Sequence, residues 1–298
     1  MEKVEPIKLD KDMKVLELVA QMGKAGFGAR KIGRANEIAK KMINDKDCKV
    51  FMGLAGAMVP AGMKQIIIDL IKERKIDVVV STGANLTHDL VESLGERHYH
   101  CDVWDDEEFR KKGYDRMYNV LMENKVYEKL EGFFESNWES LKDSGTIKEF
   151  LRKLGGLLPE GNNSILRECY ENGVQLYCPA LADSGIGLMI WGRKVAGKEI
   201  KIDAFEDMKE IIDFAWSAKK SGVIYVGGGT PKNFIQQSLQ FSKGADYGIQ
   251  ITLDRQEGGG SSGAPMEEGK SWGKLKDNAE FVDVYCDATI ALPLVFCE

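Results

Sequence analysis

One segment of the chain combines a lysine, an aromatic ring and carboxylates among small residues. It spans residues 257–274 and reads EGGGSSGAPMEEGKSWGK. Its glycines, serines and proline predict a loop, and this loop carries Glu268, Trp272 and Lys274. Carboxylates pair with ammonium groups and an indole ring packs on them, so these residue types suit an organic cation.

Lys274 has a second chemical use. A lysine amine that is desolvated or held near other cations loses its proton more readily, and the free amine forms Schiff bases. The competing interpretation is a solvated surface lysine beside a packed Trp272. The composition of the segment leaves both interpretations open.

Four other loops are rich in small residues, and each follows an apolar run. They span residues 53–62, 81–85, 183–187 and 227–230. Glycines let backbone N–H groups approach phosphate oxygens, and a following helix offers its positive end. None of the four follows the GxGxxG pattern, so tight βα turns explain them as well as a nucleotide site does.

The elements around these loops alternate between strand and helix. This alternation predicts an α/β fold with a doubly wound, mostly parallel sheet, in one domain over residues 1–298. Helices are expected at the N-terminus, and residues 104–155 are expected to form a helical insertion. The expected strands are residues 48–54, 76–80, 174–178, 222–226, 247–252 and 282–285, and the expected helices are residues 13–24, 33–44, 63–74 and 232–240.

Composition excludes several classes of protein. The 298 residues include 41 basic and 47 acidic ones, a formal charge of -6, so there is no basic footprint for nucleic acid. The apolar runs, such as residues 290–296, are too short to span a membrane. Six cysteines without a CxxC pair, and an N-terminus without a signal-peptide core, favour a cytoplasmic protein with free thiols.

The lysine segment closely resembles the active-site lysine loop of the deoxyhypusine synthase family, most clearly in SWGK at residues 271–274. The resemblance extends from Val50 to the C-terminus. Further matching segments occur in the same order, namely GLAGAMVPAGM at 53–63, DVVVSTGANLTHDL at 77–90, CPALADSGIG at 178–187, VGGGTPKN at 226–233 and YCDATIALPL at 285–294.

This resemblance implies a fold and an activity. Family enzymes have a Rossmann-like core and form homotetramers with active sites between paired subunits. They use NAD to transfer an aminobutyl group from spermidine, through an imine on the enzyme lysine, to a lysine of a translation initiation factor. In the related homospermidine synthases, putrescine is the acceptor.

The resemblance also implies roles for individual residues. Lys274 matches the lysine that forms the imine, and the polyamine side is formed by Glu268, Trp272, Asn233 and Gln237. The residues implied to bind the cofactor are Thr82, Gly83, Ala84, Asp183, Gly227, Gly228, Ser262, Asp287 and Ala288.

The sequence departs from the family pattern around the polyamine. Leu188 and Ser261 replace carboxylates, and Asn233 replaces a histidine. Three hypotheses therefore stay open: transfer to the initiation factor, transfer to putrescine or another small amine, and a binding protein without turnover. The donor amine and the general base are not determined by the sequence.

Two other groups of residues could indicate a metal site or a serine hydrolase. His98, His100 and Cys101 are close in sequence, but their spacing matches no standard zinc site, and we expect no metal. A loop in which His88 or His100 lines the cofactor pocket is the preferred interpretation. The GxSxG match at residues 259–263 lies in a loop with no later histidine, which argues against a serine hydrolase. Residues 105–108 are expected to form the first turn of an exposed helix.

Overall fold

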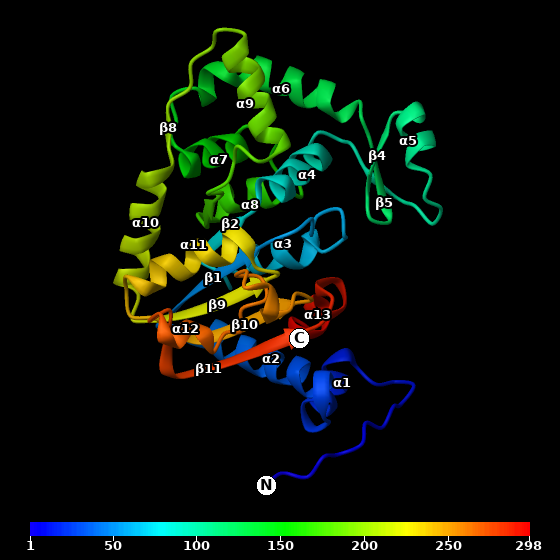
Figure 1. The fold of residues 1–298 in the computed structure, drawn as a ribbon, viewed down its shortest axis with the longest axis vertical. Coiled ribbons are helices and arrows are strands. Elements are labelled where there is room, and N and C mark those ends of the chain that lie inside the picture. The colour runs from blue at the N-terminus through cyan, green and yellow to red at the C-terminus, as the bar shows by residue number, and fades with distance from the viewer.

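A six-stranded parallel sheet forms the centre of the computed structural model, which describes residues 1–298 (Figure 1). Its strand order is β11-β10-β9-β1-β2-β7, and every neighbouring pair is parallel. The predicted doubly wound sheet is therefore confirmed. The strands are β1 (Cys48–Leu54), β2 (Val78–Ser81), β7 (Gln175–Tyr177), β9 (Lys220–Val226), β10 (Ala245–Thr252) and β11 (Leu275–Tyr285).

The order of the strands reverses between β1 and β9. From β1 the sheet grows through β2 to β7 on one side, and from β9 it grows through β10 to β11 on the other. Loops that leave the carboxyl ends of β1 and β9 therefore turn to opposite faces. In open α/β sheets, ligands bind at such a reversal.

Helices cover both faces of the sheet. Successive side chains of a strand point to opposite faces, so Met52 joins the larger buried cluster with α2, whereas Phe51 joins the smaller one with α10 and α11. The helices are α1 (Val15–Lys24), α2 (Phe27–Asn44), α3 (Lys64–Lys72), α4 (Gly83–Ser93), α5 (Asp106–Lys112), α6 (Val126–Leu141), α7 (Ile147–Gly156), α8 (Ile165–Asn172), α9 (Gly185–Val195), α10 (Ala204–Ser217), α11 (Gly229–Gln240), α12 (Glu268–Ser271) and α13 (Ala288–Val295).

The segment expected to be a helical insertion is not wholly helical. Helices α5, α6 and α7 are present, but two strands separate α5 from α6 and pair with a third strand that precedes α5. This small antiparallel sheet projects from the body as an arm (Figure 1). Its strands are β3 (His98–His100), β4 (Tyr114–Met117) and β5 (Val120–Glu123). A short sheet also joins β6 (Gly145–Thr146) to β8 (Ile202–Asp203).

Local backbone geometry explains the unexpected hairpin. Gly113 ends α5 in the left-handed region, at φ 78°, and a two-residue turn between Met117 and Val120 reverses the chain. Tyr118 in that turn has φ 51°. Strands β4 and β5 have only four residues each, too few for a clear alternating pattern, so the sequence did not predict the hairpin. The acidic run does begin an exposed helix as predicted, with Asp105 as the N-cap of α5.

Candidate active site

Lys274 lies at the start of β11, the strand at one end of the sheet. The chain leaves β10 at Thr252, passes through a 3-10 turn at Gln256–Gly258 and through α12, and then enters β11. The backbone N–H of Lys274 donates to the Gly269 carbonyl at 2.8 Å, and its carbonyl accepts from Ala245 N–H at 3.1 Å. Because Ala245 begins β10, Lys274 lies at the amino-terminal edge of the sheet.

A polar groove of about 360 Å³ lies between this lysine loop, residues 253–274, and α11. Lys274 Nζ is 5.0 Å from the centroid of the Trp272 ring, which is 55% exposed. The structure brings together in this groove all five residues predicted to bind or react with the polyamine. The groove is lined by Asn233, Gln236, Gln237, Gln240, Gly259, Ser261, Ala264, Pro265, Glu268, Gly269, Trp272 and Lys274.

The helical period of α11 explains why amides line one wall. Asn233, Gln237 and Gln240 are spaced by four and three residues, so they share one face of the helix. Phe234 and Leu239 lie on the opposite side and are buried against the sheet. One amphipathic helix thus separates the core from a wall of neutral hydrogen-bonding groups.

Lys232 is the important residue of this site that the sequence did not reveal. Its side chain is 1% exposed, and its ammonium donates to Gln250 Oε1 at 2.7 Å and to the carbonyls of Ser261 at 2.7 Å and Ala264 at 2.6 Å. Burial lowers the pKa of Lys232 to about 8, with a smaller contribution in the same direction from the charge of Lys274. A lysine within a predicted helix normally signals a solvated face, so no sequence signal marked it.

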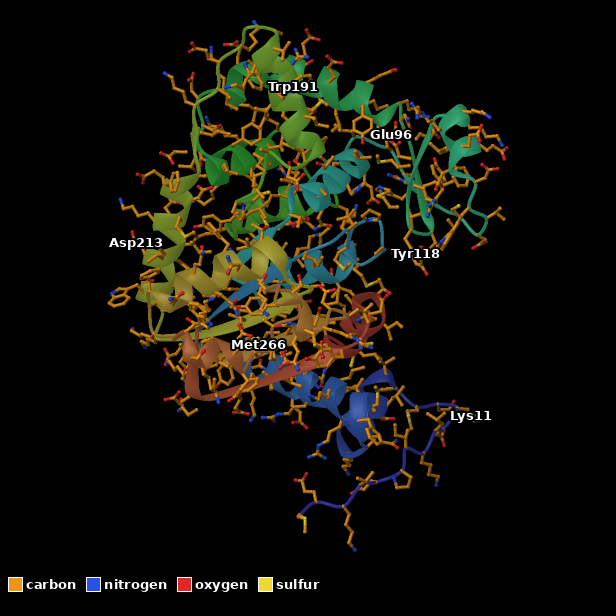
Figure 2. The ribbon with its side chains drawn as sticks, viewed as in Figure 1. Lys11, Glu96, Tyr118, Trp191, Asp213 and Met266 are labelled. Atoms are coloured by element: carbon orange, nitrogen blue, oxygen red, sulfur yellow. The ribbon has the colours of Figure 1, made fainter.

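Two further side chains, both on strands of the sheet, hold the lysine loop in place. Gln250 Nε2 donates to the Ser262 carbonyl at 2.9 Å, and Asp283 Oδ1 accepts from Met266 N–H at 3.0 Å. Burial raises the pKa of Asp283. Met266 is itself buried between the loop and the sheet, where Figure 2 labels it. Its methyl group occupies the space over Gly248, where a Cβ would lie only 2.3 Å away.

At the carboxyl edge, the glycine loop after β9 touches the lysine loop. Gly227 has φ 71° and donates from its N–H to the Ile251 carbonyl at 2.7 Å. A Cβ on Gly228 would lie 2.2 Å from Ser262 Cα, and Gly229 N–H donates to Ser262 Oγ at 3.1 Å. Three residues implied to bind the cofactor, Gly227, Gly228 and Ser262, therefore lie side by side.

A second group of cofactor-side residues lies at the ends of β2 and β7. Thr82 N–H donates to the Leu54 carbonyl at 3.1 Å, and the Thr82 hydroxyl caps α4. A Cβ on Gly83 would lie 2.6 Å from Ser184 Cβ, which places Thr82, Gly83 and Ala84 beside the loop that holds Asp183.

Asp287 lies at the end of β11, far from this second group. It accepts from Thr289 N–H at 2.7 Å as the N-cap of α13, which Ala288 begins. Strands are spaced by about 4.8 Å, so the carboxyl ends of β11 and β7 lie roughly 24 Å apart across five strand intervals. Asp287 follows β11 and Asp183 follows β7, whereas Gly227 and Thr82 follow strands separated by only two intervals. Within one chain, the residues implied to bind the cofactor are therefore distributed along the whole carboxyl edge of the sheet.

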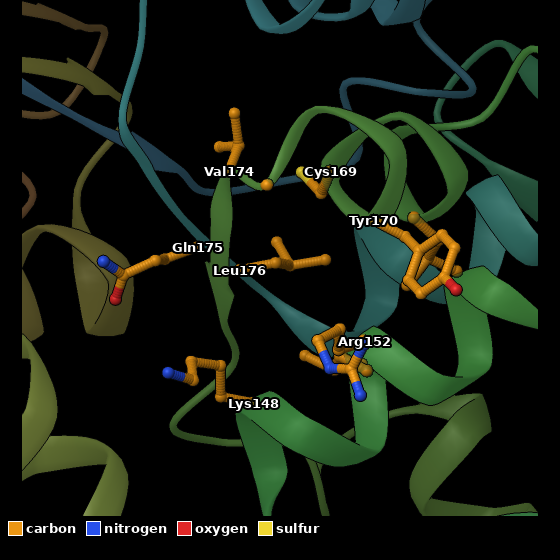
Figure 3. Close-up of a pocket in the computed structure, with 10 residues that line it drawn as sticks. Lys148, Arg152, Cys169, Tyr170, Val174, Gln175 and Leu176 are labelled. Atoms are coloured by element: carbon orange, nitrogen blue, oxygen red, sulfur yellow. The ribbon is translucent and has the colours of Figure 1, made fainter.

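A different cavity, of about 340 Å³, lies beside the free edge of β7 (Figure 3). Leu176 and Tyr170 contribute to its lining, and Lys148 and Arg152 supply positive charge. Both charges are already paired within the chain, Lys148 with Glu210 and Arg152 with Glu149. The cavity contains none of the residues singled out from the sequence.

The histidines form a chain of contacts between α4 and the arm. His88 Nδ1 lies 3.0 Å from His98 Nε2, and His98 Nδ1 lies 2.8 Å from Glu92 Oε1, which Lys64 also pairs. Burial and the neighbouring His98 lower the pKa of His88 to about 4. The expected loop here is instead strand β3, and His98 rather than His100 contacts His88.

The structure shows no cluster of three or more His, Cys, Asp or Glu side chains arranged to hold a metal ion. None of the helices combines the length and the apolar character needed to cross a membrane.

Comparisons with known proteins identify the family of this chain. The family model described as deoxyhypusine synthase matches residues 17–298. A probable deoxyhypusine synthase 1 of Methanosarcina acetivorans is 43% identical, over 98% of this chain and 92% of that protein. Another, from Archaeoglobus fulgidus, is 42% identical over 97% and 94% of the two chains.

The fold is also found in a solved structure. The crystal structure of a putative deoxyhypusine synthase from Entamoeba histolytica superposes with a TM-score of 0.66 at 18% identity, covering 98% of this chain and 95% of that one. The family model, the relatives and the residues around Lys274 lead to one conclusion: the chain belongs to the deoxyhypusine synthase family.

Proposed function

We propose that this protein transfers the aminobutyl group of spermidine to a lysine of a translation initiation factor, through a covalent imine on Lys274 and with NAD as cofactor. The observation that carries this proposal is the groove in which Lys274, Trp272 and Glu268 converge. Its other wall offers only neutral amides, so Glu268 is the one carboxylate that lines it.

The groove is suited to a flexible polyamine. The carboxylate of Glu268 pairs with a substrate ammonium, and the exposed face of Trp272 packs on the methylene chain or on a cationic nitrogen. Asn233 and Gln237 accept hydrogen bonds from further amine groups. Charge at one end and amides along the wall fix the direction in which a triamine lies.

Lys274 performs the covalent step. Its neutral amine attacks the oxidised, imine carbon of the substrate, and a new C–N bond forms. As the bond to the departing nitrogen breaks, that nitrogen takes up a proton and leaves as diaminopropane, so the four-carbon unit stays on Lys274 as an imine. The amine of the acceptor then adds to the same carbon and releases Lys274.

The glycine loop after β9 fits a dinucleotide. Gly228 leaves no room for a side chain beside Ser262, and α11 begins at Gly229 with its backbone N–H groups towards the carboxyl edge. We assign the pyrophosphate to Gly227 and Gly228, the adenosine side to Asp287 and Ala288, and the nicotinamide side to Thr82, Gly83, Ala84 and Asp183. When bound, NAD would supply the hydride acceptor for oxidation of spermidine and the hydride donor for reduction of the product imine.

We also propose that the enzyme is a cytoplasmic homotetramer whose active sites lie between subunits. Leu188, Trp191 and Val195 form an exposed apolar stripe on α9, and Figure 2 labels Trp191 on it. Because α9 begins next to Asp183, a second copy that covers this stripe would also reach the cofactor edge. All six cysteines are free, which suits a reducing compartment.

The decisive experiment is to incubate the purified protein with NAD and spermidine, without an acceptor. Mass spectrometry is expected to detect free diaminopropane and, after borohydride reduction, an aminobutyl adduct on Lys274. Absence of both at saturating NAD would contradict the proposal. Adding either the initiation factor or putrescine then identifies the acceptor from the product that accumulates.

A further inference from the structure

The buried ammonium of Lys232 has no role in the chemistry described so far. Lys232 does not line the groove, but Ser261 and Ala264, whose carbonyls accept its hydrogen bonds, both do. Its third partner, Gln250, is a buried residue of β10. Lys232 therefore lies directly behind the wall of the groove and connects α11, the sheet and the lysine loop.

The three acceptors select the charged form of Lys232. A neutral amine has two N–H donors, whereas an ammonium has three, and three oxygen acceptors lie within 2.7 Å of Nζ. Burial of a charge is unfavourable unless hydrogen bonds satisfy it, and here every donor has a partner. An apolar residue at this position would leave three buried acceptors without a donor.

The same contacts define the shape of the lysine loop. The turn at residues 261–264 precedes Met266, which Asp283 holds, and α12 follows with Glu268. Without the contact to Lys232, Gln250 and Asp283 would still tie this part of the loop to the sheet, and Gly229 at the start of α11 would still bond to Ser261 and Ser262. The turn would lose the one buried charge that joins its two carbonyls at Ser261 and Ala264. Small displacements of the turn would move Glu268, Trp272 and Lys274 together.

We propose that Lys232 is a positioning residue for the reaction at Lys274: its buried ammonium fixes the turn at residues 261–264 and thereby the loop that carries the reacting groups. The inference rests on the proposed function for its kinetic consequence, but its structural consequence is independent of it. Lys232 acts through the loop and does not itself touch the substrate.

The test compares Lys232→Met, which keeps an unbranched side chain of nearly the same length without its charge, with Lys276→Met. Lys276 is a matched control because it follows the same loop and pairs with Asp246 at 2.7 Å on the adjoining strand. In Lys232→Met we expect turnover to diaminopropane to fall about 100-fold, because misplacement by about 1 Å has such effects. The KM for spermidine should change by less than about threefold, since Glu268, Trp272 and Lys274 move together and keep their contacts to the substrate. Lys276→Met should match the parent enzyme.

Limited trypsin digestion provides a readout that does not depend on catalysis. Arg255 lies exposed in the loop, so the fragment ending at Arg255 reports how often the loop opens. It should appear about tenfold faster in Lys232→Met than in the parent or in Lys276→Met. Unchanged cleavage with unchanged turnover would overturn the proposal, and so would a loss of turnover without faster cleavage.

If Lys232→Met does not fold, Gln250→Leu gives the same test in a milder form. It removes one acceptor of Lys232 and the donor to the Ser262 carbonyl, so faster cleavage after Arg255 and about tenfold slower adduct formation are expected. Parent-like behaviour in both assays would contradict the inference. Should the parent enzyme itself release no diaminopropane, the proposed function fails, and cleavage alone then decides the role of Lys232.

Discussion

The lysine groove and the glycine loops at the carboxyl edge are built in different ways. The groove takes its reacting groups from side chains on a loop, and that loop is held by a few buried polar contacts from Lys232, Gln250 and Asp283. The carboxyl edge takes its shape from backbone at the ends of strands, where Gly228 has no space for a Cβ.

The two kinds of construction tolerate different substitutions. Side chains in the groove can be replaced without altering the backbone, and two of the family departures, Ser261 and Asn233, line it. The third, Leu188, lies outside the groove on α9. At the carboxyl edge, a single added carbon collides with the main chain. Substitutions in the groove should therefore change chemistry or substrate affinity, and those at the edge should change folding and cofactor affinity.

The largest effect is expected from Lys274→Ala. Turnover should fall by at least about 10⁴-fold because the variant has no amine to form the imine. NAD binding should stay within about tenfold, since no contact joins the Lys274 side chain to the carboxyl edge. The borohydride trapping assay checks the loss of turnover, and calorimetric titration with NAD checks that binding is retained. A large loss of NAD affinity would show that the two regions are not separate.

Gly228→Ala tests the carboxyl edge. The new Cβ would lie 2.2 Å from Ser262 Cα, a backbone atom that cannot move aside cheaply, so unfolding free energy should fall by about 1–3 kcal/mol. NAD affinity should weaken with it. Gly258→Ala is the matched control, because no atom lies within 4 Å of its Cβ position, and it should stay within about 0.5 kcal/mol in urea denaturation.

The third prediction concerns the pH dependence of stability near the carboxyl edge, where α4 follows β2 and carries His88. The pKa of His88, on α4, is lowered from 6.5 to about 4, so between these values the unfolded chain binds more protons than the folded one. Unfolding free energy should therefore fall as the pH drops from 6.5 to 4. At about 1.4 kcal/mol per unit of pKa shift, and with the ring only partly buried, the loss should be about 1–2 kcal/mol.

Urea midpoints measured across this pH range check the expectation. His88→Asn should give a flatter profile, because it has no group that titrates in the window. A variant profile as steep as that of the parent would assign the acid sensitivity to other groups, such as Glu92.

The smallest effect is expected from Glu268→Gln in the groove. The amide keeps the shape but loses the charge-assisted contact to an ammonium, and because Glu268 is exposed we expect only about a tenfold rise in the KM for spermidine. Steady-state kinetics at saturating NAD measure it. A fall in turnover with unchanged KM would instead place Glu268 in the covalent step.

Much of this architecture was predictable because it depends on local patterns. Apolar runs followed by small-residue loops gave β1 exactly, and gave five further strands of the sheet with shifted ends. The arm was missed because β4 and β5 are only four residues long and their turn at Tyr118 carries no glycine. Short strands depend on pairing partners that a linear pattern does not show.

The residues that converge on Lys274 were singled out from the sequence through motif and resemblance, and so were the separate loops of the carboxyl edge. Their arrangement in space depends on how the folded chain packs. This packing placed Lys274 at the amino-terminal edge of the sheet and buried Lys232 behind the groove. The reason is physical: a sequence specifies which side chains are available, whereas burial and hydrogen-bond partners arise when distant strands such as β10 and α11 pack together.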